Sequence, residues 1–338
     1  MKIFFLGRTQ MLMRTIELFE KTEHSIVGIG TCKAAEEYLV NENDFMRKAE
    51  DLEVPFFCNS KINSQEIHEL LVNLHADIAI SINWLTLISD STMKLFHYGI
   101  LNGHAGDLPR YRGNACPNWA IINGEKSIGV SVHFMEADEL DSGDVVVKEY
   151  IPVTDHTTIG MIYKDMEILF PKMFLQAVNK IEELGERAGI TQSKKKEDIL
   201  RCYPRIPSDS CIDWNNSCID INRLIRASGY PFRGAYTFLN GTEKLYILEA
   251  DVLEYKVPSS VVYGQVVYRN CEKDCIGIAA KDGIVMVYKL CDENRRPYKV
   301  TDKVKSMRDR MGIHLPDKVY ELMKELETLK KRIKSHEC

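Results

Sequence analysis

The stretch ADIAISI, residues 76–82, decides the fold of this chain. It is almost continuously apolar, which is typical of a strand buried on both faces of a parallel sheet. The chain before it alternates between apolar runs and segments with helical spacing. The predicted strands are 2–7, 24–31 and 54–58, and the predicted helices are 9–21, part of 33–53, and 64–74. This order predicts an α/β fold with a doubly wound, mostly parallel sheet, whose ligands bind beyond the carboxyl ends of the strands.

A polar motif follows this fourth strand and a short predicted helix over 92–99. The motif begins with ILNGHAGDLPRYRG (100–113), and the Gly-containing loop ADELDSGDVV (137–146) follows it. If the start of the motif is an extended strand, Asn102 and His104 point to the same face of the sheet. The sequence therefore predicts a polar site where parallel sheets bind their ligands.

The residue types in this motif suit acyl transfer. An imidazole such as that of His104 can accept a proton from an amine, and the carboxamide of Asn102 can stabilise an oxyanion. A carboxylate such as that of Asp141 can orient the imidazole and stabilise its charged form. A lone Asn-x-His is usually a strand end with a satisfied histidine, and Asp141 taken alone is a turn residue before Gly143.

Length, charge and composition limit the class of protein. A chain of 338 residues favours two domains, and a net charge of −5 with a pI near 6.0 argues against a nucleic acid as the main partner. No apolar run approaches the roughly 18 residues of a membrane span, so no membrane partner is predicted. The N-terminal MKIFFLGRTQ favours a first strand over a signal peptide. Ten scattered cysteines fit reduced thiols, and a cytoplasmic location is expected.

Signatures of several other chemistries are missing from the sequence. The closest cysteines, Cys271 and Cys275, have no further His or Cys pair at metal-ligand spacing, so no metal site is predicted. The glycines after the first strands do not form G-x-G-x-x-G, and no P-loop is present. A nicotinamide or flavin dinucleotide is therefore not expected.

The hydrophobic period changes in the second half of the chain. Strands over 129–135 and 144–153 are predicted on either side of the acidic loop, followed by a long helix over 157–184. Short strands with Gly and Asn turns then predict a β-rich, barrel-like domain. A charged helix over 315–336 is expected to pack on the body of the protein or on a second subunit, which leaves a homodimer open. The predicted domains are a catalytic domain 1–190, a linker 191–205, a β-rich domain 206–300 and a helical extension 301–338.

The motif region resembles the formyltransferases that use 10-formyltetrahydrofolate. The shared pattern is N-x-H…LP-x-Y-x-G followed by a D-x-G loop, and it is written here as NGH…LPRYRG and LDSG. The resemblance implies that Asn102, His104 and Asp141 form the catalytic triad, with Asp144 as the alternative carboxylate. It also implies 10-formyltetrahydrofolate as co-substrate and no metal. One departure is that the usual H-x-SLLP is HAGDLP here, so that Gly106 and Asp107 are expected to alter the substrate pocket.

Within this family the chain looks most like the sugar-nucleotide N-formyltransferases. The segments PNWAIINGE (117–125), RIPSDSCIDW (205–214) and LIRASGYPFRGAY (224–236) resemble the domain that formylates UDP-4-amino-4-deoxy-L-arabinose. The resemblance implies a UDP-linked 4-amino sugar as acceptor, in the synthesis of surface glycans. TDP- or GDP-linked sugars stay open.

Two alternatives to this acceptor remain. Methionyl-tRNA formyltransferases share both domains, but they carry a basic loop where this chain has TCKAAEEYLVNENDF (31–45), which is acidic on balance and would repel phosphates. The second alternative is a formyltransferase-like binding or tailoring module without free activity, which the intact triad argues against.

The resemblance also suggests which residues contact the two substrates. Backbone groups are expected to bind the folate at Thr86, Ile88, Ala137 and Glu139. Side chains that could bind the sugar nucleotide are Tyr111, Arg112, Asn118, Arg205 and Arg226, because arginine forks suit diphosphates and Tyr or Asn can bind a hydroxyl or base. Surface or domain-junction ion pairs are the alternative for the arginines. His133 and His156 are expected to be structural, and Trp119 is expected in the core.

Overall fold

The computed structural model describes residues 1–35, 38–137, 139–254 and 260–336. The chain divides into two compact units, Met1–Arg205 and Ile206–Cys338. Two of the segments singled out above, 31–45 and 136–141, contain Glu36, Glu37 and Asp138, which lie outside the described residues.

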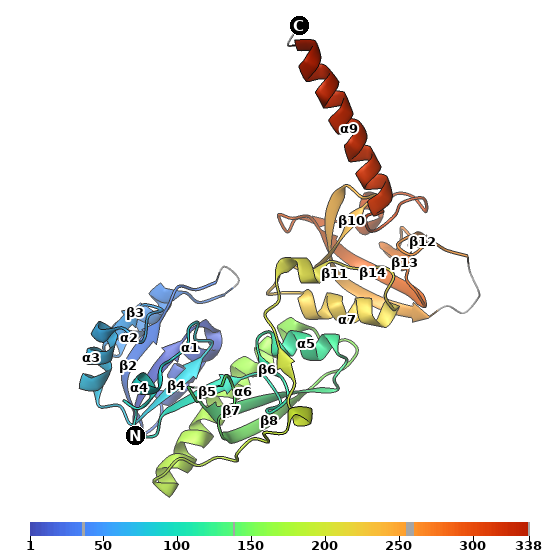
Figure 1. The fold of residues 1–338 in the computed structure, drawn as a ribbon. Coiled ribbons are helices and arrows are strands. Elements are labelled where there is room, and N and C mark those ends of the chain that lie inside the picture. The colour runs from blue at the N-terminus through green and yellow to red at the C-terminus, as the bar shows by residue number, and fades with distance from the viewer. Residues whose placement is uncertain (36–37, 138, 255–259, 337–338) are drawn as a thin grey trace. The chain divides into compact units, whose positions relative to one another are not determined.

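The N-terminal unit is built on a seven-stranded sheet with the strand order β3-β2-β1-β4-β5-β7-β8 (Figure 1). The first five of these strands are parallel, and β7 and β8 add an antiparallel edge. This confirms the predicted doubly wound, mostly parallel fold. The strands are β1 (Lys2–Gly7), β2 (Ser25–Thr31), β3 (Phe56–Cys58), β4 (Ile78–Ile82), β5 (Ile100–His104), β7 (Ser127–Phe134) and β8 (Val145–Pro152).

Helices pack on this sheet through their apolar faces. In α1, the side chains of Leu12, Ile16 and Phe19 are fully buried, as the helical spacing predicts. The helices are α1 (Thr9–Phe19), α2 (Glu42–Asp51), α3 (Gln65–Leu74), α4 (Asp90–Met93), α5 (Cys116–Ile122) and α6 (Ile159–Leu184). A small pair of strands, β6 (Arg112–Gly113) and β9 (Arg201–Cys202), ties the motif loop to the end of the unit.

The short helix before the motif differs from its predicted range of 92–99. The hydroxyl of Ser89 accepts a hydrogen bond from the Thr92 amide, so α4 begins at Asp90. The helix ends at Met93. The chain then turns into β5 through Gly99, whose positive φ of 85° lies in the left-handed region. Apolar spacing did not reveal this cap.

The neighbours of β5 in the sheet, β4 and β7, are each fixed by close backbone contacts. A Cβ atom on Gly7, at the end of β1, would lie 1.9 Å from the carbonyl oxygen of Ile82 on β4, so only glycine fits there. On the other side of β5, antiparallel pairing with β7 places Asn102 opposite His133. The carboxyl end of β5 therefore lies between a parallel and an antiparallel neighbour.

The C-terminal unit contains an antiparallel sheet with the order β10-β11-β14-β13-β12, and β15 pairs with β14. Its edge strands are bridged by one segment, because Met311 pairs with Leu239 and Arg310 pairs with Gln265. The predicted β-rich C-terminal domain is confirmed. Its strands are β10 (Ala235–Leu239), β11 (Glu243–Glu254), β12 (Val266–Asn270), β13 (Cys275–Ala279), β14 (Gly283–Cys291) and β15 (Pro297–Tyr298).

Helices α7 (Cys218–Ser228), α8 (Val300–Lys303) and α9 (Leu315–His336) accompany this sheet. Ile221 and Ile225 of α7 are buried in the core of the unit beside Trp214, whose indole N–H donates to Thr237. Two short 3-10 turns, η1 (Lys196–Asp198) and η2 (Pro207–Ser210), lie on either side of the division between the units. Among the described residues, no helix is long and apolar enough to cross a membrane.

Candidate active site

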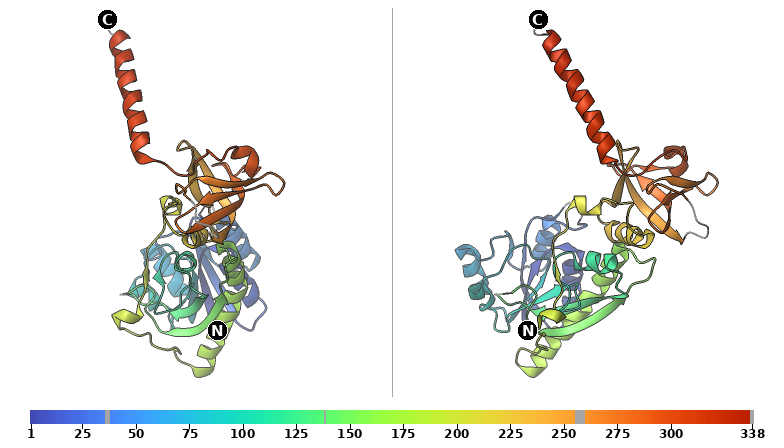
Figure 2. Two further views of the ribbon diagram at one scale, coloured as in Figure 1. Left: turned by 90° about the vertical axis from the view of Figure 1, so that its right-hand side faces the viewer. Right: turned by 45° about the vertical axis from the view of Figure 1, so that its right-hand side comes forward.

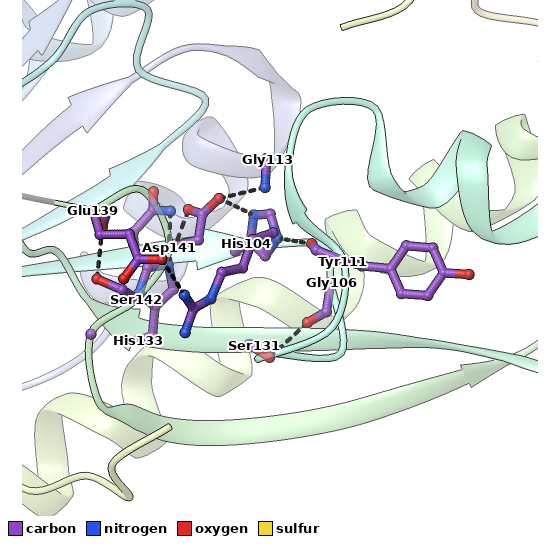
Figure 3. Close-up of polar contacts among 12 residues, drawn as sticks. His104, Gly106, Tyr111, Gly113, Ser131, His133, Glu139, Asp141 and Ser142 are labelled. Carbon is purple, nitrogen blue, oxygen red and sulfur yellow. Dashed lines mark hydrogen bonds and ion pairs between the residues drawn. The ribbon is translucent and has the colours of Figure 1, made fainter. Parts of the chain in front are cut away.

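The carboxylate of Asp141 lies between two imidazoles. Its Oδ2 is 3.6 Å from Nδ1 of His104, and its Oδ1 is 3.6 Å from Nε2 of His133. The amide N–H of Gly113 donates to Oδ2 at 2.8 Å, and Figure 3 shows these groups around the carboxylate. The backbone of Asp141 has a left-handed φ of 56°, which aims the side chain back at the sheet.

Asp141 is ionised in this environment. Burial opposes its charge, but the positive charge that His104 or His133 carries when protonated, together with the Gly113 amide, holds the pKa of this carboxyl well below its usual range. The alternative carboxylate, Asp144, lies after the loop turn, and its backbone carbonyl accepts from the Phe134 amide. In the part of the chain that the structure describes, the pair of imidazoles is found at Asp141 and not at Asp144.

The geometry around His104 favours a neutral ring. Burial lowers its pKa, and the negative charge of Asp141 opposes that shift. Nε2 lies 2.6 Å from the carbonyl oxygen of Tyr111, a distance at which Nε2–H donates to that oxygen. In the neutral ring, Nδ1 then carries the lone pair, and its 3.6 Å separation from Asp141 is longer than a hydrogen bond. The imidazole can therefore accept a proton at Nδ1 beside a carboxylate that stabilises the resulting cation.

His133 orients the carboxamide of Asn102. Its Nδ1–H donates to the Phe134 carbonyl at 2.8 Å, so Nε2 is left to accept from Nδ2 of Asn102 at 3.1 Å. His133 is 1% exposed and also faces Asp141. His133, expected to be structural, thus positions Asn102. The role of His133 follows from the register of β5 and β7, which cannot be predicted from the pattern of either strand alone.

A buried arginine holds the loop that carries Asp141. The side chain of Arg112 is 2% exposed, and its guanidinium donates to Glu139 at 2.7 Å. It also donates twice to the side-chain oxygen of Gln192, at 2.9 and 3.2 Å. The amide of Gln192 in turn donates to the backbone carbonyls of Asp141 and Gly143 at 2.9 and 2.7 Å. Gln192 thus connects the buried cation to the loop of the carboxylate.

Two cavities meet at His104. One, of about 180 Å³, lies on the side of β4 and the acidic loop, and its lining residues include Trp84, Ile88 and Met135. The other, of about 130 Å³, lies toward α5 and α6 and includes Tyr163 and Met166. The residues that line both are Asn83, Gly103, His104, Gly113 and Asn114. The imidazole can therefore face two separate ligands at once.

The structure places three of the four expected folate contacts in the first of these cavities. Thr86, Ile88 and Ala137 line it together with Asn102 and Asp141. The fourth, Glu139, is instead engaged with Arg112 through its side chain, and it is absent from the described residues that line this cavity.

Two side chains expected to bind the acceptor are occupied by the protein. The guanidinium of Arg112 is buried in the contacts just described, so it is not available to a diphosphate. The hydroxyl of Tyr111 donates to Glu125 at 2.7 Å and accepts from Asn123 at 3.2 Å. Figure 3 shows the Tyr111 ring pointing away from His104, while its carbonyl faces the imidazole. In this structure the side chains of both residues are thus engaged by protein partners.

The other expected acceptor residues belong to different segments of the two units. Asn118 is 4% exposed within α5, and the guanidinium of Arg205 lies 5.5 Å from the centre of the Trp119 ring. Trp119 is half-buried, and its indole N–H donates to the Tyr203 carbonyl, so it is not a core residue as expected. Arg226 belongs to the C-terminal unit, on α7.

Gly106 and Asp107, where the sequence departs from the usual motif, are not among the described residues that line the two cavities at His104. The carboxylate of Asp107 accepts from Lys148 at 3.0 Å and from Tyr150 at 2.9 Å, and both partners lie on β8. Gly106 packs behind His104, because a Cβ there would lie 2.4 Å from its Nε2. Its carbonyl accepts from Ser131.

No metal centre accompanies these residues. Among residues 1–35, 38–137, 139–254 and 260–336, no group of three or more His, Cys, Asp or Glu side chains is arranged to hold a metal ion.

Replacing Gln192 by Leu tests the connection between Arg112 and the loop. The buried guanidinium loses two hydrogen bonds and two loop carbonyls lose a donor, so the thermal midpoint is expected to fall, with a loss of about 2–4 kcal/mol of stability. The matched control is Lys194→Leu, two residues further on and exposed, which should leave the midpoint unchanged. Equal midpoints for the two variants would contradict the role given to Gln192.

Two family models match most of the chain. A family model described as "Formyl transferase" matches residues 1–178, and one described as "Formyl transferase, C-terminal domain" matches residues 206–308. The chain is 26% identical to a methionyl-tRNA formyltransferase of Alkaliphilus oremlandii over 89% of this chain and 95% of that protein. It is 30% identical to a methionyl-tRNA formyltransferase of Clostridium tetani over 75% of this chain and 78% of that protein. It is 29% identical to the bifunctional polymyxin resistance protein ArnA of Wigglesworthia glossinidia brevipalpis, over 67% of this chain and 34% of that protein.

Solved structures share the fold. HypX from Aquifex aeolicus, in complex with tetrahydrofolic acid, superposes with a TM-score of 0.58 at 18% identity, over 90% of this chain and 47% of HypX, so this chain spans about half of that protein. An N-formyltransferase from Helicobacter canadensis, in complex with folinic acid and dTDP-3-aminofucose, gives a TM-score of 0.56 at 15% identity, over 88% of this chain and 100% of that one. With both domain models matched in order, the chain belongs to the formyl transferase family and is a folate-dependent transferase.

Proposed function

We propose that this protein transfers the formyl group of 10-formyltetrahydrofolate to a primary amine at His104. The observation that carries this proposal is the position of that imidazole between two cavities. Donor and acceptor must approach one another from different sides, and a base between them can act on the amine as it attacks.

The cavity next to Asp141 suits the formyl donor. Its walls combine apolar side chains, such as Trp84, Ile88 and Met135, with the polar groups of Asn102 and Asp141. A flat pterin needs apolar faces and a few hydrogen bonds at its edge, which is the composition of most small-molecule sites. The second cavity, toward α6, then takes the amine.

Each residue of the triad has one task in this mechanism. The amine nitrogen forms a bond to the formyl carbon, and the carboxamide of Asn102, held by His133, donates to the oxygen on which negative charge develops. The proton leaves the amine for Nδ1 of His104, and Asp141 stabilises the imidazolium. The bond between the formyl carbon and the folate nitrogen then breaks, and that nitrogen takes the proton from the His104 imidazolium, so that tetrahydrofolate leaves and the neutral base is restored.

The comparisons favour methionyl-tRNA as the acceptor over the nucleotide sugar expected from the sequence. The methionyl-tRNA formyltransferase of Alkaliphilus oremlandii aligns with nearly the full chain, whereas the alignment with ArnA covers about a third of that protein. The C-terminal unit also contains a basic segment, residues 295–310, with seven Arg and Lys against two Asp. Basic side chains of this kind attract the phosphates of a nucleic acid. We therefore take the α-amino group of methionyl-tRNA as the first candidate.

A nucleotide-linked amino sugar is the second candidate, on a specific observation. Segment 31–45 carries one Lys against four Asp and Glu, and such a charge repels a polyanion. The relation to ArnA and the fold shared with the enzyme from Helicobacter canadensis support the same candidate. In this case the relevant transfer is to a UDP- or TDP-linked deoxy amino sugar.

The acceptor is decided by offering both classes at the same concentration of donor. Initiator methionyl-tRNA and a panel of UDP- and dTDP-linked amino sugars should be compared by the mass gain of about 28 Da that a formyl group adds. If methionyl-tRNA is the substrate, K305E/R308E should raise its KM several-fold with little change in kcat, because these two charges act on phosphates. Turnover of an amino sugar and none of the tRNA would reverse the order of the two candidates.

The pH dependence of the reaction tests the state of His104. The lowered pKa of this imidazole keeps it neutral, and so active as a base, down to a pH below its ordinary value of 6.5. The acid limb of kcat/KM is therefore expected below pH 6.5, and activity is lost as the pH falls through it. Asp141→Asn removes the charge that supports the imidazolium, so the limb should move to lower pH while the maximum rate falls by about two orders of magnitude. An acid limb that shifts to higher pH in Asp141→Asn would contradict this assignment.

The two cavities predict separate effects on the two substrates. Ala137→Trp fills the cavity beside Asp141, so it should raise the KM for the folate by about tenfold or more and leave the KM for the acceptor nearly unchanged. Tyr163→Ala, in the other cavity, should show the opposite pattern. Binding of 5-formyltetrahydrofolate, measured by calorimetry, should be lost in the first variant and retained in the second. The reversed pattern would mean that the folate binds in the cavity toward α6 and the acceptor in the cavity beside Asp141. Equal effects of both variants on both KM values would contradict separate binding of the two substrates.

A further inference from the structure

Helix α9 has an apolar stripe that the rest of its unit leaves uncovered. Five large apolar side chains at three- and four-residue spacing are between 52% and 58% exposed. They are Val319, Leu322, Leu326, Leu329 and Ile333. Figure 2 shows α9 as one continuous helix in both views. A row of large apolar side chains on a regular helix marks an interaction surface.

The spacing of the stripe is that of a coiled coil. From Leu315 to Ile333 six apolar residues follow one another by alternating steps of four and three, which is a heptad repeat, and Met323 adds an apolar side chain at position e beside it. With Val319 at position a, the a positions are Val319, Leu326 and Ile333, and the d positions are Leu315, Leu322 and Leu329. A helix that only packs on a globular core carries a wider, less regular stripe.

The choice of residues at these positions selects the number of strands. Two of the three a positions are β-branched, Val319 and Ile333, and every d position is leucine. β-branched residues at a with leucine at d favour two parallel strands over three or four. The stripe therefore suits one partner helix of the same design.

Charges beside the stripe fit a second copy of the same helix. Glu325 is at position g and Lys330 at position e, and both are exposed. In a parallel pair, Glu325 of each copy faces Lys330 of the other, which gives two attractive pairs across the seam. The contacts within the helix, between Lys318 and Glu321 and between the Lys324 ammonium and the Tyr320 ring, leave the a and d side chains from Val319 to Ile333 exposed.

We infer that α9 associates with α9 of a second copy of this chain as a parallel, two-stranded coiled coil, and so makes the protein a homodimer. The inference rests on α9 alone and is independent of the proposed function. It assigns a partner to a long helix whose apolar stripe the C-terminal unit does not bury.

Sedimentation equilibrium of the full chain tests the dimer. The wild-type protein at tens of micromolar should approach twice the 38.8 kDa of one chain. Leu329→Asp, at a d position, should raise the dimer dissociation constant by about a hundredfold or more. Its matched control is the neighbour Thr328→Asp, which adds the same charge at the outer position c and should dimerise like the wild type. A wild-type monomer at every concentration, a trimer, or equal behaviour of the two variants would overturn the inference.

Reversing the flanking charges tests the orientation of the strands. Glu325→Lys and Lys330→Glu should each raise the dissociation constant about fivefold or more, and the double variant E325K/K330E should restore it. In an antiparallel pair Glu325 instead faces a g position such as Arg332, so the double variant would set two cations against one another and would stay weak. Failure of the double variant to restore dimerisation would exclude the parallel arrangement.

Discussion

The site depends on keeping the charge of Asp141 inside the protein. A buried carboxylate is costly unless hydrogen bonds or opposite charges compensate it. Here the Gly113 amide donates to Asp141, and the two imidazoles 3.6 Å away compensate its charge when either is protonated. Because Asp141 stays ionised, His104 can remain a neutral base and still become an imidazolium at little cost. The same carboxylate faces His133, which orients Asn102. The proposed proton acceptor and oxyanion donor are thus organised around one buried charge.

Backbone groups and the residues behind the loop fix the position of that charge. The left-handed conformation of Asp141 turns its side chain toward β5, and Gln192 holds the loop from behind by linking its carbonyls to Arg112. The pair of strands β6 and β9 brings Arg112 and Gly113 against the chain that follows Gln192. The end of the N-terminal unit, which looks like a polar linker in sequence, therefore supports the loop of the carboxylate.

The fold and the grouping of Asn102, His104 and Asp141 could be predicted from the sequence, because both rest on short-range patterns. The continuous apolar runs 2–7 and 76–82 imply buried parallel strands, and the strings NGH and LDSG carry the three residues in two segments.

The predictions that failed concern residues whose partners are distant in sequence. The role of His133 follows from the pairing of β5 with β7, and the occupation of Arg112 and Tyr111 follows from partners that are distant in sequence. Arg and Tyr next to a motif look available to a ligand until their partners are known. The heptad of α9 was visible in the sequence, but only its exposure in the structure distinguished a second chain from the body of the protein as its partner.

The central claim is that His104 is neutral, carries its proton on Nε2 and faces an ionised Asp141. The most direct measurement is nitrogen NMR of the histidine side chains during a pH titration, with His104→Gln used to assign the resonance. The account predicts a neutral Nε2–H tautomer of His104 at neutral pH, with a pKa below 6.5 that falls further in Asp141→Asn. An imidazolium at neutral pH, or a proton on Nδ1 of the neutral ring, would contradict it.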